Sequence, residues 1–350
     1  MTAAEASAAS PRAMAEDALQ QEQLGQWEAA ARLYALSFRA AVLGRDVSQA
    51  ADALRGQARV LVQEERFDEA AELVELSREI AERSGLPQAA ARAVNVLGII
   101  RYRQRDWDGA GEQYRRALEL ALDLGDDDLA GLAVQNAGVI AYVRGDLREA
   151  RSLYLESIGA FVRSGNTASA VLAYNNLGIA CADLREWLEA EIYYTRGIEL
   201  AERHSQPALL AKLYGNRAEP LIEIGETAQA LDTLQRAAAL AEAVGDRLGL
   251  ADVERWRARI ARIANDAGGA ETHLQRALEL AAEPSLERAS AFRELALLRR
   301  AQMRQQEVRE AYLSADALYR LLGAEGHARE TAEALAALEE AYPSSTAGAG

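Results

Sequence analysis

The chain has 350 residues, of which 27% are charged, and its formal net charge is −15. This acidic balance argues against general binding to nucleic acids or to anionic membranes. No run of 18 apolar residues predicts a membrane-spanning helix, and the N-terminus lacks the basic and apolar segments of a signal peptide. We therefore expect a cytoplasmic protein whose partners are neither nucleic acids nor membranes.

An alanine recurs along nearly the whole chain at a spacing of 40 residues. The series is Ala30, Ala70, Ala110, Ala150, Ala190, Ala230 and Ala270, and Ala311 follows after 41. A period of 20 to 50 residues indicates a stacked array, in which each unit buries its apolar face against its neighbours. Because the core of such an array lengthens rather than thickens, the chain is expected to form one array and not several domains.

Two further rows of residues indicate that each period holds a pair of helices. Twelve positions before the alanines lie small residues, namely Ala18, Ala58, Gly98, Gly138, Gly178, Ala218 and Ala258. Four positions after the alanines lie large residues, namely Tyr34, Val74, Tyr114, Tyr154, Tyr194, Leu234 and Leu274. Small residues let two helices approach closely, and a large side chain fills the space beside them.

In chain order, the first helix of each repeat is predicted at 11–24, 47–64, 87–104, 127–144, 167–184, 207–224, 247–264 and 286–303. The second helices are predicted at 27–43, 67–84, 107–124, 147–164, 187–203, 227–244, 267–282 and 307–322. A last helix at 326–342 has an apolar side of Leu335, Leu338 and Tyr342, which is typical of a terminal cap. Residues 1–10 and 343–350 are expected to be disordered.

Helix ends carry the expected capping residues. Ser10 and Pro11 predict an N-cap followed by a proline at the first helical position. Glycines recur where the second helices end, at Gly85, Gly125, Gly165 and Gly245, because a left-handed C-cap favours glycine.

This arrangement resembles the tetratricopeptide repeat, whose helix pairs carry a small residue in the first helix and an Ala-x-x-x-aromatic pattern in the second. The resemblance covers nearly the whole chain, although a period of 40 exceeds the usual 34 and is similar to the long-helix branch of the family. The family's signature Trp and Pro positions are not kept, and Trp27, Trp107 and Trp187 instead begin alternate second helices. The resemblance implies an all-α, right-handed solenoid of about eight antiparallel helix pairs over 11–325, closed by the capping helix.

No catalytic or cofactor motif is present in the sequence. The three histidines, His204, His273 and His327, lie in different repeats, and none has a second ligand at metal-binding spacing. The single cysteine, Cys181, falls on the inward side of a first helix, which favours a small buried apolar residue over a reactive thiol. We therefore expect neither an enzyme nor a bound cofactor or metal.

The resemblance implies that the first helices line a concave groove. Its facing positions are taken as −6, −3, +1, +4 and +5 from the small residue of each first helix. Over seven repeats these positions hold nine bases, namely Arg12, Arg55, Arg59, Arg92, Arg103, Lys212, Arg255, Arg259 and Arg262. They hold six acids, namely Glu22, Asp52, Asp183, Glu219, Glu223 and Asp252. Two interpretations stay open: the arginine stems cover neighbouring helices, or the groove accepts an extended segment with acidic flanks.

Asparagines add a second feature to the groove. Asn136, Asn176 and Asn216 are spaced by 40, and Asn95 and Asn175 lie one position earlier in their repeats. A row of amides can pair with a peptide backbone, since each offers a donor and an acceptor. The alternative is that the amides bond across adjacent helices and only fix their packing. The expected groove residues are Arg92, Asn95, Tyr102, Arg103, Gln135, Asn136, Tyr142, Asn175, Asn176, Lys212, Asn216, Arg255 and Arg259.

The chaperone-adaptor branch of the family grips a terminal carboxylate with a Lys-Asn-Asn-Lys-Arg clamp. Asn176 and Lys212 match two of those positions, whereas Gln135, Val139 and Asn216 do not match the others. Capture of a terminal carboxylate is therefore not the expected main mode of binding.

The expected function is a non-enzymatic scaffold that binds an extended peptide or a partner helix in its concave groove. The alternative is a bacterial signalling sensor, in which a small anionic ligand or a signalling peptide binds among Arg92, Arg103, Arg255 and Arg259 and so regulates a partner. The regular repeats are also compatible with a homo-oligomer formed by end-to-end stacking.

Overall fold

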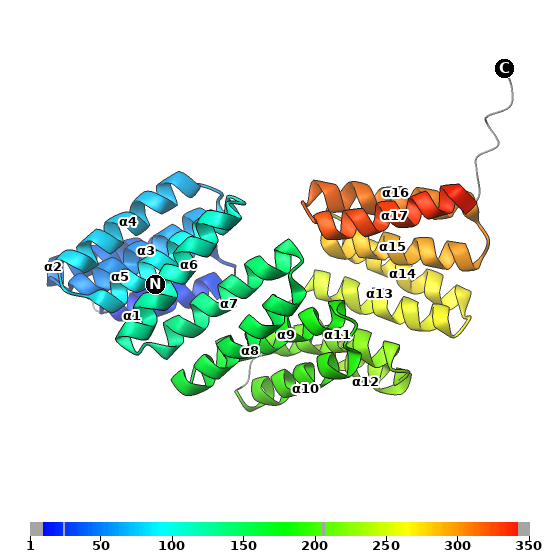
Figure 1. The fold of residues 1–350 in the computed structure, drawn as a ribbon, viewed down its shortest axis with the longest axis horizontal. Helices are drawn as coiled ribbons and strands as arrows, with labels where there is room; N and C mark the ends of the chain where they lie inside the picture. The colour runs from blue at the N-terminus through cyan, green and yellow to red at the C-terminus, as the bar shows by residue number, and fades with distance from the viewer. Residues whose placement is uncertain (1–9, 24, 205–206, 342–350) are drawn as a thin grey trace, which may run out of the picture. The chain divides into compact units, whose positions relative to one another are not determined.

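The computed structural model describes residues 10–23, 25–204 and 207–341. These residues form seventeen α-helices and no strand, and the helices make an all-α solenoid (Figure 1). From α1 to α8, and again from α10 to α17, each helix packs on the next. The chain divides into two compact units, with the boundary between Ala173 and Tyr174 inside α9. The expected disordered ends, 1–10 and 343–350, lie outside the described residues except for residue 10.

Each repeat supplies one first helix and one second helix. The first helices are α1 (Pro11–Gln23), α3 (Val47–Gln63), α5 (Pro87–Arg103), α7 (Asp127–Arg144), α9 (Thr167–Asp183), α11 (Pro207–Glu223), α13 (Arg247–Ile263) and α15 (Leu286–Ala301). The second helices are α2 (Trp27–Gly44), α4 (Phe67–Arg83), α6 (Trp107–Leu124), α8 (Leu147–Ser164), α10 (Trp187–Arg203), α12 (Thr227–Val244), α14 (Ala267–Leu280) and α16 (Gln305–Leu321). The last helix is α17 (Glu325–Ala341), and all these bounds agree with the predicted ones within two residues.

Glycine and tyrosine interlock where the first and second helices of a repeat meet. A Cβ atom placed on Gly178 would lie 2.5 Å from Cε1 of Tyr194, and one on Gly138 would lie 2.8 Å from Cε1 of Tyr154. Gly98 faces Tyr114 in the same way. The predicted rows of small and large residues are therefore in direct contact, and the missing side chain is what admits the ring.

Turns between helices follow two series with left-handed backbone. The first series comprises Gly25, Glu65, Arg105, Gly145, Arg185, Gly225, Asn265 and Met303, which lie after first helices. The second comprises Arg45, Gly85, Gly125, Gly165, Gly245 and Gly323, which lie after second helices and include all four glycines predicted as C-caps. In the first series most members are not glycine, although they share the conformation. The packed helices on both sides hold these residues in a conformation that their side chains disfavour.

Side chains cap several helix N-termini, because the first N–H groups of a helix have no partner within it. Ser10 accepts a hydrogen bond from the amide of Ala13 at 3.1 Å, which confirms the predicted N-cap. An aspartate fills the same role ahead of α3, α6, α7, α13 and α14, at Asp46, Asp106, Asp126, Asp246 and Asp266.

The apolar interior runs along each unit as a chain of small clusters between neighbouring helices. In unit two, Leu335 and Leu338 of α17 pack against a cluster that includes Val308 and Tyr312. Tyr342, the third apolar residue expected for this helix, lies outside the described residues. Cys181 is fully buried, as expected for a small apolar residue.

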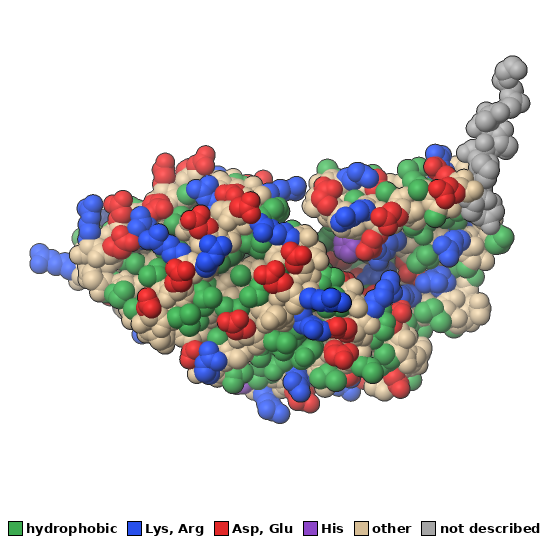
Figure 2. Space-filling model, in the orientation of Figure 1, with side chains coloured by type: hydrophobic (Ala, Val, Ile, Leu, Met, Phe, Trp, Pro, Cys, Tyr) green, Lys and Arg blue, Asp and Glu red, His purple; other side chains and the backbone are tan. Residues whose placement is uncertain are grey.

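The surface of each unit carries acidic and basic side chains in close alternation, as the face drawn in Figure 2 shows. Within the described part of the chain, no helix has the length and apolar character needed to cross a bilayer.

Candidate binding surface

First helices form a continuous face in each unit. In unit one α3 packs against both α1 and α5, and α5 packs against α7; in unit two α13 packs against both α11 and α15. In the described part of the chain, the substantial contacts between helices two apart in the chain all join one first helix to another. In a curved stack the elements on the inner side lie closest together. The first helices therefore occupy the inner side of each unit.

Asparagines link successive first helices by the same bond in both units. Nδ2 of Asn136 donates to Oδ1 of Asn95 at 3.2 Å, and Nδ2 of Asn216 donates to Oδ1 of Asn175 at 2.9 Å. The contact expected of packing asparagines is thus present. Each bond uses one donor and one acceptor, so the oxygen of one amide and the N–H₂ of the other stay uncommitted among the described residues. Asn176 is half-buried and its side chain bonds to no described residue.

Three further expected residues lie on the first helices of unit one. The side-chain oxygen of Gln135 is buried without a hydrogen-bond partner among the described residues. Tyr102 is half-buried, and its ring lies 5.2 Å from that of Trp107, centroid to centroid. Burial raises the pKa of Tyr102, while the nearby Arg103 lowers it. Tyr142 is half-buried on α7.

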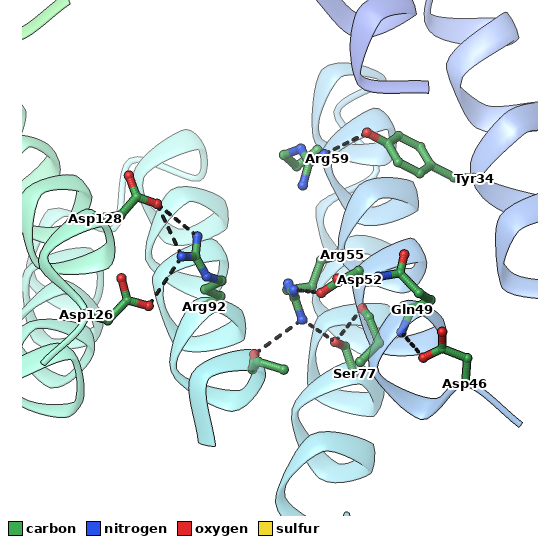
Figure 3. A network of polar contacts seen from close by, with 12 residues as sticks. Tyr34, Asp46, Gln49, Asp52, Arg55, Arg59, Ser77, Arg92, Asp126 and Asp128 are labelled. Atoms are coloured by element: carbon green, nitrogen blue, oxygen red, sulfur yellow. Dashed lines mark hydrogen bonds and ion pairs between the residues drawn. The ribbon is translucent and has the colours of Figure 1, made fainter. Parts of the chain in front are cut away.

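Three arginines of unit one, Arg55, Arg59 and Arg92, line a cleft of about 400 Å³. Figure 3 shows the three side chains and their polar contacts. We call this cleft the arginine cleft, and its lining residues are Ala15, Leu19, Tyr34, Ser48, Asp52, Arg55, Arg59, Gln88, Ala89 and Arg92. They come from α1, α2, α3 and α5, and therefore from three consecutive repeats. Three of the ten side chains are guanidinium groups and one is a carboxylate, so the wall of the cleft is cationic.

Arg55 forms the buried part of the arginine cleft, and its side chain is only 8% exposed. It is paired with Asp52 on the same helix, and its Nη1 lies 3.4 Å from Oγ of Ser77 and 3.3 Å from the carbonyl oxygen of Ala89. Burial lowers the pKa of Arg55, and Asp52 opposes that effect.

Arg59 lies one turn further along α3. Its Nε and Nη2 donate to the two carboxylate oxygens of Glu22 at 3.2 and 3.1 Å, and Nη2 also donates to the hydroxyl of Tyr34 at 2.8 Å. Burial raises the pKa of Tyr34 although Arg59 lowers it. The tyrosine therefore stays protonated at neutral pH.

Arg92 reaches the cleft from α5. Its guanidinium donates to Asp128 at 3.2 Å and to Asp126 at 3.3 Å, and both aspartates lie at the start of the next first helix. Arg103 is exposed, eleven residues further along α5, which is about 16 Å along a helix. Arg92 and Arg103 therefore lie three turns apart on α5.

In unit two the expected arginines surround a buried tryptophan. Arg255 donates to Asp252 at 2.6 and 2.8 Å, and its guanidinium carbon lies 3.8 Å from the ring centroid of Trp256. Arg259 lies 5.3 Å from the same centroid and pairs with Glu219 at 3.4 Å. Burial lowers the pKa of Arg255, but the attraction of Asp252 and other nearby carboxylates outweighs burial, so that the pKa is raised overall. Burial also raises the pKa of Glu219, although Arg255 and Arg259 lower it.

Acidic partners therefore surround the groove arginines in both units. Arg262 donates to Glu294 at 2.5 Å, and Arg259 also pairs with Glu223. Acids on the same or a neighbouring helix therefore form ion pairs with most of the bases that were counted at the groove positions. In unit two these acids pair with Arg259 and Arg262. In unit one Arg55, Arg59 and Arg92 have acidic partners as well, and they also line an open cleft.

A second cleft of about 340 Å³ lies in unit two, between α11, α12 and α13. Lys212 and Asn216 line it together with small residues such as Ala211, Gly215 and Ala237. The lysine and one asparagine of the expected groove are thus brought together. No group of three or more His, Cys, Asp or Glu residues suited to a metal is found among the described residues.

Arg55, Arg59 and Tyr34 line the arginine cleft, and the groove residues expected from the sequence do not include them. A signal existed, because Arg55 and Arg59 stand at the −3 and +1 positions of the repeat and were counted among its bases. Their convergence with Arg92 depends on the distance between α3 and α5, which the sequence does not state.

No family model matches the sequence, and no curated protein matches it. Solved structures do match. The quorum sensor NprR from B. thuringiensis has a TM-score of 0.57 and 13% identity, covering 93% of this chain and 98% of that one. A signal transduction ATPase from Pyrococcus horikoshii with a tetratricopeptide repeat sensor gives a TM-score of 0.66 and 13% identity, over 87% of this chain and 46% of that one.

A third structure is the Rap conjugation gene regulator of the plasmid pLS20 in complex with the Phr* peptide. Its TM-score is 0.55 and its identity 12%, over 79% of this chain and 77% of that one. At these identities the likeness concerns the fold, and it confirms the resemblance seen in the repeats. The chain has the fold of the tetratricopeptide-repeat proteins and is an all-α solenoid of that type.

Proposed function

We propose that the chain is a non-enzymatic interaction protein that binds an extended peptide or a partner helix along its first-helix face. The observation that carries this proposal is the repeated amide pair. Asn95 pairs with Asn136, and Asn175 pairs with Asn216, on a face built from successive first helices. Asn95 is buried, whereas the other three amides are half-buried and keep donor or acceptor groups that bond to no other described residue. An extended backbone offers the complementary groups at regular intervals and can bond to them without its side chains being read.

A structure of the same fold supports this proposal, because it is described as a regulator in complex with a peptide. Another structure of this fold is described as a quorum sensor. The proposal extends peptide binding to this chain.

The test is a selection from a phage-displayed library of 12-residue peptides against the full chain, followed by calorimetry with the dominant peptide. Replacing the asparagine of the unit that holds the peptide, Asn136 in unit one or Asn216 in unit two, by alanine should weaken binding about 2- to 10-fold, since each lost hydrogen bond is worth roughly 0.5–1.5 kcal/mol. Gln229→Ala, at an exposed position on the second helix α12, should bind as the parent does.

Thermal melting separates binding from packing. If the asparagine variants melt lower but hold the peptide with parental affinity, the amides only fix the helices and the proposal fails. Failure of the parent to select any common peptide would also count against it.

A further inference from the structure

We propose that the arginine cleft of unit one binds a carboxylate group, supplied by an acidic side chain of the segment that lies on the first-helix face. This inference rests on the proposed function, and it names the chemistry that anchors the partner. It concerns Arg55, Arg59 and Arg92, which line the cleft from two successive first helices.

The acids that hold Arg59 and Arg92 are not part of the cleft wall. Glu22, Asp126 and Asp128 are absent from the lining, whereas both guanidinium groups are present in it. Figure 3 shows Arg55 and Arg59 on α3 and Arg92 on α5, with Asp126 and Asp128 on the far side of Arg92. A group entering the cleft therefore meets the three cations and a single carboxylate, that of Asp52.

Spare donors remain on these guanidinium groups. A guanidinium has five N–H donors, and the bonds of Arg59 use its Nε and Nη2. Nη1 of Arg59 donates to no described residue, and neither does Nε of Arg92. Arginine matches a carboxylate in shape and charge, and such charge-assisted bonds are stronger than neutral ones.

Burial of Arg55 strengthens its attraction for a carboxylate that enters the cleft. The Arg55 side chain is only 8% exposed, and its two Nη1 contacts are long, at 3.3 and 3.4 Å. A buried cation with weakly satisfied donors gains from a second anion, because the attraction is screened less than at the surface. Ala15, Leu19 and Ala89 supply an apolar wall for the methylene groups that carry the carboxylate.

The test compares the dominant peptide of the library selection with a copy in which its acidic residues are changed to Asn or Gln. Both peptides are acetylated and amidated, so they carry no terminal carboxylate. We expect the parent protein to bind the acidic peptide about tenfold more tightly than the neutral copy, as expected for one charge-assisted contact.

Three variants sharpen the test. Arg59→Gln with Glu22→Gln removes the cation without leaving Glu22 as an unpaired buried charge. This double variant should bring the ratio of the affinities for the acidic and the neutral peptide close to one. Glu22→Gln alone frees Arg59 and should increase the preference for the acidic peptide. Arg32→Gln, which changes an exposed arginine on α2 outside the cleft, should leave the preference unchanged.

Other sources of a carboxylate are separated by two further probes. One is the neutral peptide with a free C-terminus, and the other is citrate, titrated by calorimetry and by thermal melting. One of these probes could bind in place of the acidic side chain and lose its binding when Arg59 is replaced. The cleft would then still be a carboxylate site, but its assignment to a side chain of the partner would be overturned.

The outcomes for the two proposals differ. Peptides that bind through the asparagines without any preference for acids, or a preference that survives loss of Arg59, would overturn this inference alone. If no peptide is selected, the proposed function fails, and absence of Arg59-dependent citrate binding would then overturn the carboxylate site as well.

Discussion

At the scale of single residues, close helix contact depends on the missing side chain of a few glycines. The ring of Tyr194 occupies the space that a methyl group on Gly178 would need, with a distance of only 2.5 Å. Gly215 differs, because it is buried in α11 and yet a Cβ atom there would meet no atom within 4 Å. The two positions should therefore respond in opposite ways to the same change.

We predict that Gly178→Ala lowers the free energy of unfolding by about 1–3 kcal/mol through overpacking against Tyr194. Gly215→Ala should raise it by about 0.5–1 kcal/mol, since a helical glycine is replaced in open space. Urea unfolding of both variants measures the difference. Equal effects of the same sign would show that the contact with Tyr194 does not govern the packing of α9 on α10.

At the scale of a helix, α17 ends the described array and carries a histidine, His327, whose ring lies beside a buried tyrosine. The ring of His327 lies 5.2 Å from that of Tyr319, centroid to centroid. Partial loss of solvent around the ring lowers the pKa of His327, and the positive charge of Arg293 lowers it further. Arg255 acts in the same direction, while Glu330 and Asp183 oppose both arginines. Protonation of His327 is therefore less favourable in the folded chain than in the unfolded one.

This difference gives a prediction with a definite sign. A base whose pKa is lowered on folding takes up its proton first in the unfolded chain, so stability is lost as the pH falls below the ordinary value of 6.5. Between pH 7.5 and 5, the parent should lose more stability than His327→Gln does. Urea midpoints at several pH values check this, and parallel profiles for the two proteins would contradict it.

At the scale of the whole molecule, the core is a series of clusters between neighbouring helices. Leu274 of α14 is almost fully buried and packs with Ala258, Ala270 and Leu298, which come from α13, α14 and α15. In repeat arrays stability is close to a sum of local terms. Damage at one repeat should therefore stay near that repeat.

We predict that Leu274→Ala costs about 2–5 kcal/mol in the repeats it contacts, as expected for a large-to-small change in a core. Hydrogen exchange measured by mass spectrometry should become faster in α13 to α16 and stay unchanged in α1 to α4. Faster exchange throughout the chain would indicate a single cooperative unit instead.

The sequence by itself determined the repeat, the helices and their bounds, because the 40-residue period states the same local pattern many times. It also placed the glycines that face Tyr154 and Tyr194, since these contacts lie within one repeat. It did not show the left-handed turns at Glu65 and Arg105, where packing of the flanking helices overrides the preference of the residue.

Only the tertiary structure decided which charges meet. Arg59 pairs with Glu22 across 37 residues, and Arg92 pairs with Asp126 across 34. Such pairs depend on the distance and rotation between helices of different repeats, and these follow from the packing of every side chain between them. The same geometry gathers three arginines at one cleft and bonds Asn136 to Asn95 and Asn216 to Asn175. The period placed these residues on the first helices, and the packing of those helices decided which side chains they pair with.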